Sequence, residues 1–135
     1  MQEDIESLPV VTLVGPQVTW VAPDTDLVDV ASALTIESIG AVVVGAHGGL
    51  RGILSERDVV HAVAAGRDLK ATRAIDIAST ELVWCDANAP IADVATEMME
   101  RYVRHVLVED AGTLVGIVSA RDLLGVYATS PVEVE

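Results

Sequence analysis

The stretch GIVSARD at residues 116–122 decides the fold, because a close copy of it, GILSERD, stands at residues 52–58. In both copies a short apolar run ends in a serine that is followed three residues later by an aspartate. Ser-x-x-Asp ahead of an apolar-periodic segment predicts a helix start with a capping box. The leading glycine allows another group to approach the backbone closely. A strand that runs into such a helix offers free N–H groups, a hydroxyl, a carboxylate and a guanidinium at one point. We interpret this as a candidate site for phosphate and sugar groups.

The two stretches belong to a longer internal repeat. They are offset by 64 residues (116 − 52 = 64), and this offset aligns residues 20–64 with residues 84–128 without a gap. Of the 45 aligned pairs 14 are identical, where about four are expected by chance. The chain is therefore predicted to hold two tandem copies of one unit.

Each copy has the pattern of a strand, a helix, two strands and a second helix. The expected strands are residues 18–22, 41–44 and 50–54, then 82–85, 106–108 and 114–118. The expected helices span 27 to about 36, 56 to about 65, 90–101 and 120–128. The segment at 71–78 looks helical, whereas for 7–14 the repeat favours a helix and the valine content a strand, so both stay open.

Composition limits the classes of function. The chain has 135 residues and carries 21 acidic and 8 basic side chains, a net charge of −13. Nucleic-acid binding needs a basic face and is disfavoured. The longest apolar run, about residues 39–46, is far too short to cross a bilayer, and residues 1–6 are acidic where a signal peptide is basic. We expect a soluble, cytoplasmic protein without a membrane partner.

The sole cysteine, Cys85, excludes an internal disulfide and a cysteine-cluster metal site. It is expected to be a buried structural thiol. The second helix of each copy is apolar around much of its surface, which favours a homodimer interface. The residues concerned are Val59, Val60, Val63, Leu123, Leu124, Val126 and Tyr127.

Two β-α-β-β-α copies that each carry Gly-h-h-Ser-x-x-Asp (h, apolar) resemble a tandem pair of cystathionine-β-synthase (CBS) domains, also called a Bateman module. The resemblance covers about residues 7–128. It implies an α/β chain of the α+β type with a pseudo-two-fold axis. Domain 1 is expected at residues 7–66 and domain 2 at 71–128, together one compact module with tails at 1–6 and 129–135. Members commonly bind adenosine nucleotides or S-adenosylmethionine in clefts between the copies and regulate an enzyme, channel or transporter.

The resemblance also implies roles for single residues. The motif aspartate holds the ribose hydroxyls, the serine contacts ribose or phosphate, and the residue before the aspartate reaches phosphate. One cleft is expected to combine Ser119, Arg121 and Asp122 with Thr25, Ile39, Gly40 and Ala41. The other is expected to combine Ser55, Arg57 and Asp58 with Val103, Arg104 and His105. Because Gly40 and Ala41 are replaced by Arg104 and His105 in the second copy, the two clefts are expected to differ.

These residues also have a purely structural interpretation. The serines suffice as helix caps, worth about 1 kcal/mol each, and Trp20 and Trp84 suit packing better than ligand stacking. The sequence carries no common hydrolase, metalloprotease or phosphate-loop motif, so we expect no enzyme and no metal site. The expected function is regulatory: a homodimer that binds AMP, ADP, ATP or S-adenosylmethionine as a regulatory ligand, requires no cofactor, and signals to a partner protein in trans. The alternative is a ligand-free dimerisation scaffold with degenerate clefts.

Overall fold

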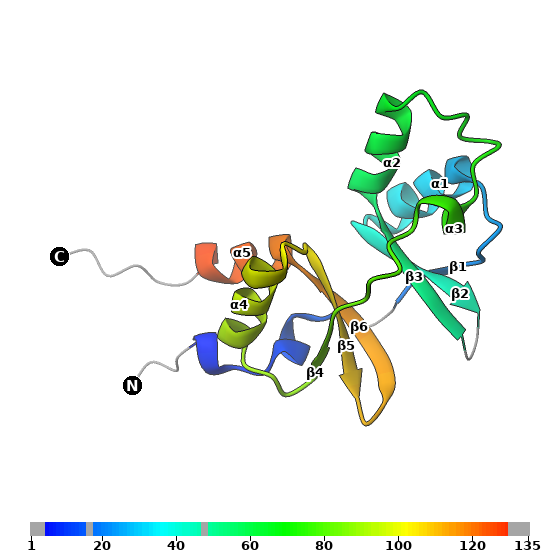
Figure 1. The fold of residues 1–135 in the computed structure, drawn as a ribbon. Helices are drawn as coiled ribbons and strands as arrows, with labels where there is room; N and C mark the ends of the chain where they lie inside the picture. Colours follow the sequence, from blue (N-terminus) through cyan, green and yellow to red (C-terminus); the bar gives the residue numbers. More distant parts are fainter. Residues whose placement is uncertain (1–4, 16–17, 47–48, 130–135) are drawn as a thin grey trace. The chain divides into compact units, whose positions relative to one another are not determined.

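The computed structural model describes residues 5–15, 18–46 and 49–129. The chain divides into two compact units, each built around its own three-stranded sheet (Figure 1). Residues 18–82 form the first-repeat unit. Residues 83–135 together with residues 1–17 form the second-repeat unit.

The sheet of the first-repeat unit has the order β1-β2-β3. Its strands are β1 (Trp20–Val21), β2 (Ala41–Ala46) and β3 (Gly49–Ser55), with β1 parallel and β3 antiparallel to β2. Its helices are α1 (Leu27–Glu37), α2 (Glu56–Ala64) and the short α3 (Ala74–Ile77). The central strand β2 is buried from Ala41 through Gly45, as its uninterrupted apolar sequence predicts.

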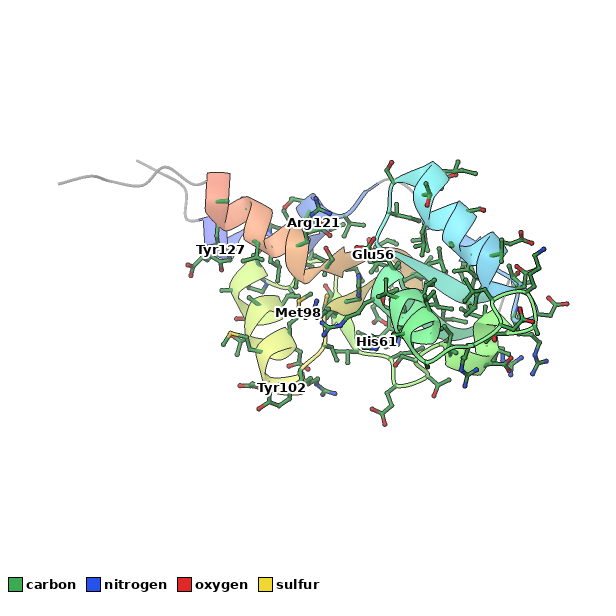
Figure 2. All side chains as sticks on the ribbon, turned by 90° about the horizontal axis from the view of Figure 1, so that it is seen from above. Glu56, His61, Met98, Tyr102, Arg121 and Tyr127 are labelled. Carbon is green, nitrogen blue, oxygen red and sulfur yellow. The ribbon has the colours of Figure 1, made fainter. Side chains whose placement is uncertain are left out.

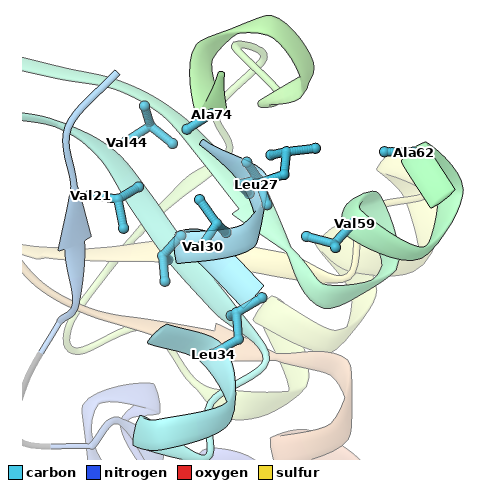
Figure 3. Close-up of a cluster of buried hydrophobic side chains, with 10 residues drawn as sticks. Val21, Leu27, Val30, Leu34, Val44, Val59, Ala62 and Ala74 are labelled. Carbon is cyan, nitrogen blue, oxygen red and sulfur yellow. The ribbon is translucent and has the colours of Figure 1, made fainter. Parts of the chain in front are cut away.

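Helices and sheet enclose one apolar cluster in this unit (Figure 3). Val21, Val42 and Val44 come from the strands, and Leu27, Val30 and Leu34 from α1, whose apolar side chains recur at helical spacing. Leu54, Val59, Ala62 and Ala74 complete it. Full burial of a valine or leucine contributes about 1.5–3 kcal/mol, so this cluster fixes the positions of β3 and α2.

The second-repeat unit repeats this arrangement 64 residues later. Its strands are β4 (Trp84–Asp86), β5 (His105–Asp110) and β6 (Thr113–Ser119), and its helices are α4 (Ile91–Arg101) and α5 (Ala120–Thr129). Trp84 pairs with Leu107 as Trp20 pairs with Val43, and the same bulge interrupts both hairpins. Val106, Val108, Val118, Ile91, Val94, Met98 and Leu123 form its core with Val10 and Ala87. The predicted α+β fold of two β-α-β-β-α repeats is confirmed.

The segment ahead of the first repeat packs on the second. Residues 5–14 form two 3-10 turns, η1 (Ile5–Ser7) and η2 (Val10–Leu13), which answers the open choice between helix and strand. The Val10 N–H donates to Ala89 O at 2.8 Å, and the Ile91 N–H donates to Leu8 O at 3.0 Å. Val10 is completely buried in the second core. The segment at 71–78 is helical only over α3, which belongs to the first-repeat unit.

Several predicted boundaries were wrong. β1 has two residues instead of five. At its C-terminal end the chain turns, and the Thr25 N–H donates to Ala22 O at 3.0 Å. Pro90 has an extended ψ of 143° and is the N-cap of α4, so it lies just before the helix and not in its first turn. Pro9, the N-cap of η2, is extended in the same way, with a ψ of 137°. β2 and β5 extend past the predicted strands to Ala46 and Asp110. The connection between the predicted strands 41–44 and 50–54 falls partly on residues 47–48, outside the described residues.

Candidate functional site

The motif of the first repeat forms a complete capping box where β3 ends and α2 begins. The Asp58 N–H donates to Ser55 Oγ at 3.2 Å. Asp58 Oδ2 in turn accepts from the Ser55 N–H at 2.8 Å and from the Ser55 hydroxyl at 3.0 Å. The predicted helix start is therefore confirmed, and one carboxylate oxygen of Asp58 is committed to holding it.

The motif of the second repeat makes the same contacts with the backbone, but its serine hydroxyl is hydrogen-bonded differently. The Ser119 N–H donates to Asp122 Oδ2 at 2.8 Å, and the Asp122 N–H donates to Ser119 Oγ at 3.0 Å. Within the described residues the Ser119 hydroxyl donates to no acceptor, whereas that of Ser55 is taken by Asp58. Asp122 is exposed and Asp58 half-buried. The second motif is thus more open to an external group.

The helix starts offer fewer N–H groups than the sequence suggested. The first N–H of α2, from Glu56, donates to Gly40 O at 2.9 Å, and the first N–H of α5, from Ala120, donates to Arg104 O at 2.8 Å. Because the third N–H of each helix is used by the serine, only the second, that of Arg57 or Arg121, lacks an acceptor in the described chain. The expectation of several free N–H groups was wrong, since a distant carbonyl occupies one of them.

The motif glycines have a structural cause. A Cβ on Gly52 would lie 2.9 Å from Ser79 O, and a Cβ on Gly116 would overlap Val14 Cγ1. Close approach to the glycine backbone was predicted and is observed. In each unit the approaching group is a segment of the same chain.

The remaining predicted residues lie where the middle strand of each sheet begins. Ala41 pairs with Ser55, and His105 pairs with Ser119. Ile39 and Val103 pack against the two cores, and half-buried Thr25 precedes α1. Each unit therefore brings one strand start next to its own serine and aspartate. Both predicted clefts combine residues from the two units, and that grouping stays a prediction.

Three arginines stand in the motifs or at the start of the neighbouring strand, and in the described part of the chain they form no ion pair. The ion pairs in the described part of the chain are Arg73–Asp76 and Arg101–Glu97. Arg57, Arg104 and Arg121 are exposed and lie outside them. Figure 2 shows Arg121 at the beginning of α5 and Tyr127 near its far end. In a chain of net charge −13, unpaired cations at the motifs favour an anionic ligand there.

Cys85 lies apart from this chemistry. It is half-buried, and burial raises the pKa of its thiol to about 11, with further contributions from Asp86, Glu109 and Glu97. The thiol is therefore protonated at neutral pH and suited to packing, not to nucleophilic attack.

The second helices expose matching apolar pairs. Val59 and Leu123 are buried in the two cores. Val60 and Val63 on α2 are 62% and 57% exposed, and their repeat equivalents on α5, Leu124 and Tyr127, are 68% and 39% exposed. Within the described residues there is no cluster of three or more histidine, cysteine, aspartate or glutamate side chains arranged to hold a metal. No helix in that part of the chain is long and apolar enough to span a membrane.

The sequence matches the family described as CBS domain twice, at residues 10–65 and 74–129. The chain therefore belongs to the CBS-domain family and carries two CBS domains in tandem, an arrangement that forms a regulatory module.

Proteins of this kind align along most of the chain. The CBS domain-containing protein YhcV of Bacillus subtilis is 34% identical over 108 residues, which are 79% of this chain and 76% of that protein. Among solved structures, a CBS-domain protein of Agrobacterium tumefaciens is 34% identical with a TM-score of 0.78, covering 88% of this chain and 98% of its own. A CBS domain protein of Pyrobaculum aerophilum complexed with AMP is 27% identical with a TM-score of 0.76, covering 91% of this chain and all of its own (100%).

Proposed function

We propose that this CBS pair is a non-enzymatic sensor that binds an adenosine-containing metabolite between its two repeats and signals to a partner protein in trans. The candidate ligands are AMP, ADP, ATP and S-adenosylmethionine. The observation that carries the proposal is the pair of serine–aspartate boxes, each followed by a helix whose second residue is an unpaired arginine. The AMP complex of the relative from Pyrobaculum aerophilum supports the ligand class.

The geometry of each box assigns its atoms to separate tasks. Oδ2 of Asp58 and of Asp122 holds a serine N–H, whereas Oδ1 has no partner in the described chain. Oδ1 has two lone pairs, which suit the two hydroxyls of a ribose cis-diol. The guanidinium and the N–H of Arg57 or Arg121 are donors suited to a phosphate. Fold and ligand thus use different oxygens of one carboxylate.

The two proposed clefts differ in charge. One combines Ser119, Arg121 and Asp122 with Thr25, Ile39, Gly40 and Ala41. The small side chains of Gly40 and Ala41 would leave room for a base. The other combines Ser55, Arg57 and Asp58 with Val103, Arg104 and His105. Because the second has more cationic groups, we propose that it takes the more highly phosphorylated ligand.

Self-association completes the proposal. The exposed pairs Val60/Val63 and Leu124/Tyr127 occupy the same positions of the two repeats, and we propose that they form a homodimer interface in the cytoplasm. Ligand binding would change the equilibrium between arrangements of the units, and a partner would recognise one of them.

Thermal unfolding with AMP, ADP, ATP or S-adenosylmethionine tests the ligand. A ligand at 100 times its Kd adds about 2.7 kcal/mol to the free energy of unfolding. Asp58→Asn and Asp122→Asn keep a carbonyl oxygen for the serine N–H and remove the charge, so they should fold and lose the shift from their own cleft. Asp76→Asn is the control at another helix start, because Asp76 Oδ2 accepts the Arg73 N–H at 2.9 Å just ahead of α3. If none of the four compounds shifts the transition, the ligand-free scaffold is the better description.

A further inference from the structure

The chain passes from one compact unit to the other at residues 17/18 and again at 82/83. Each connecting segment begins just after a residue that packs against the glycine of a motif strand, by which we mean β3 or β6. Val14 lies against Gly116 of β6, and Ala78 and Ser79 lie against Gly52 of β3. The glycine of each motif therefore packs against the residue at which a connecting segment between the units begins.

The second connecting segment is held by backbone hydrogen bonds at both ends. On the first-repeat unit, the Ser79 N–H donates to Ile53 O at 2.9 Å and the Ile53 N–H donates to Ser79 O at 3.0 Å. On the second-repeat unit, the Leu107 N–H donates to Val83 O at 2.8 Å. Only residues 80–82 lie between these two anchors. Four residue steps from Ser79 to Val83 reach at most about 14 Å, so the two anchors cannot move further apart than that.

The first connecting segment has equivalent anchors. The Val43 N–H donates to Thr19 O at 2.9 Å, as Leu107 does to Val83 (83 − 19 = 64). Its other anchor, Val14 on Gly116, is made by side-chain packing without the paired hydrogen bonds of Ser79. Each connecting segment is thus a tether that links the motif strand of one unit, β3 or β6, to the central strand of the other, β5 or β2.

We propose that these two tethers couple the units, so that a disturbance at the motif strand of one is passed to the central strand of the other. β3 reaches Ser55 two residues after Ile53, and β6 reaches Ser119 three residues after Gly116. A change at either serine–aspartate box therefore acts close to an anchor. This deepens the regulatory role proposed above, and its first test uses no ligand.

The test lengthens the tethers and follows amide hydrogen exchange. One variant carries Gly-Ser-Gly-Ser between Thr80 and Glu81, which are both exposed, and a second adds the same insertion after Gly15. The control places the insertion after Gly112, an exposed turn glycine at which an added Cβ would meet no atom within 4 Å. Each chain is compared with and without Ile91→Val, which removes one buried methyl group from the second core.

In the parent chain, Ile91→Val should accelerate exchange about twofold to tenfold in β5 and β6, and measurably in β2 and β3 as well. With lengthened tethers the acceleration should stay in the second-repeat unit, whereas the control should behave as the parent. If an insertion variant fails to fold, Thr80→Gly with Glu81→Gly gives a softer tether and a smaller effect in the same direction.

The proposal is overturned if the parent shows no transfer to β2 and β3, or if transfer survives both insertions. A second arm adds AMP. If AMP slows amide exchange in both units of the parent but in fewer strands of the lengthened chain, the coupling also transmits ligand binding. Absence of any protection by AMP counts against AMP as the ligand and leaves the ligand-free result standing.

Discussion

At the scale of the residue, the motif glycines carry a packing role that their sequence context only partly reveals. Gly-h-h-Ser-x-x-Asp predicts a helix start and an approach to the glycine, but it does not say what approaches. The capping contacts were predictable because they join residues three apart. The occupation of the first helical N–H by Gly40 or Arg104 was not, because it depends on strand pairing between distant residues.

Gly116→Ala should lower the free energy of unfolding by about 1–3 kcal/mol, because the new methyl group overlaps Val14. Val14→Ala in the same chain should recover part of this loss. Denaturant unfolding of the two single variants and the double variant measures the interaction. Additive effects of the two substitutions would contradict the contact.

The Cys85 thiol should react slowly with alkylating reagents at neutral pH, because its pKa is raised to about 11. Since the folded pKa exceeds the unfolded value, the associated stability is present below about pH 9 and is lost as pH rises toward 11. Alkylation rates of native and denatured protein across this range test it. Equal rates near pH 8 would show an unperturbed thiol.

At the scale of the element, the repeat offset predicted more than local propensity did. Strands and helices follow from patterns of two to four residues. The 64-residue offset assigns each of them to its repeat, and it favoured a helix for residues 7–14 where the valine content favoured a strand. The leading segment was undetermined because 3-10 turns have no long periodicity and its partner Ala89 is 79 residues away (89 − 10 = 79). Val10 and Val14 serve the second core, so the segment has the valine content of a strand without forming one.

Val10→Ala should therefore destabilise the second repeat, although residue 10 precedes the first. We expect a loss of about 1–3 kcal/mol, with faster amide exchange in α4 and β6. Val11→Ala is the matched control, since Val11 is 38% exposed. A response confined to β1–β3 would place the segment on the other repeat.

At the scale of the whole molecule, two repeats with the same fold have different surfaces. The starts of β2 and β5 differ, because the first repeat has Gly40 and Ala41 where the second has Arg104 and His105. The exposed apolar pairs on α2 and α5 are alike. The difference bears on the proposed ligand, and the likeness bears on the proposed self-association. Sequence alone predicts both residue sets, because the repeat aligns them, but it does not supply the arrangement of the clefts.

Leu124→Asp together with Val60→Asp should convert a dimer into a monomer, because each places a charge in the proposed apolar interface. Light scattering after size-exclusion chromatography measures the mass. Ile36→Asp is the control, as Ile36 is 78% exposed on α1, outside that interface. A monomeric parent, or dissociation by the control alone, would contradict the assignment.

Isothermal titration of AMP into the parent, Asp58→Asn, Asp122→Asn and the double variant tests the central claim most directly. The parent should bind, each single variant should lose the site that contains its aspartate, and the double variant should bind at least tenfold more weakly while its serine caps persist. Unchanged AMP affinity in the double variant would contradict the claim, since neither motif carboxylate would then hold the ligand.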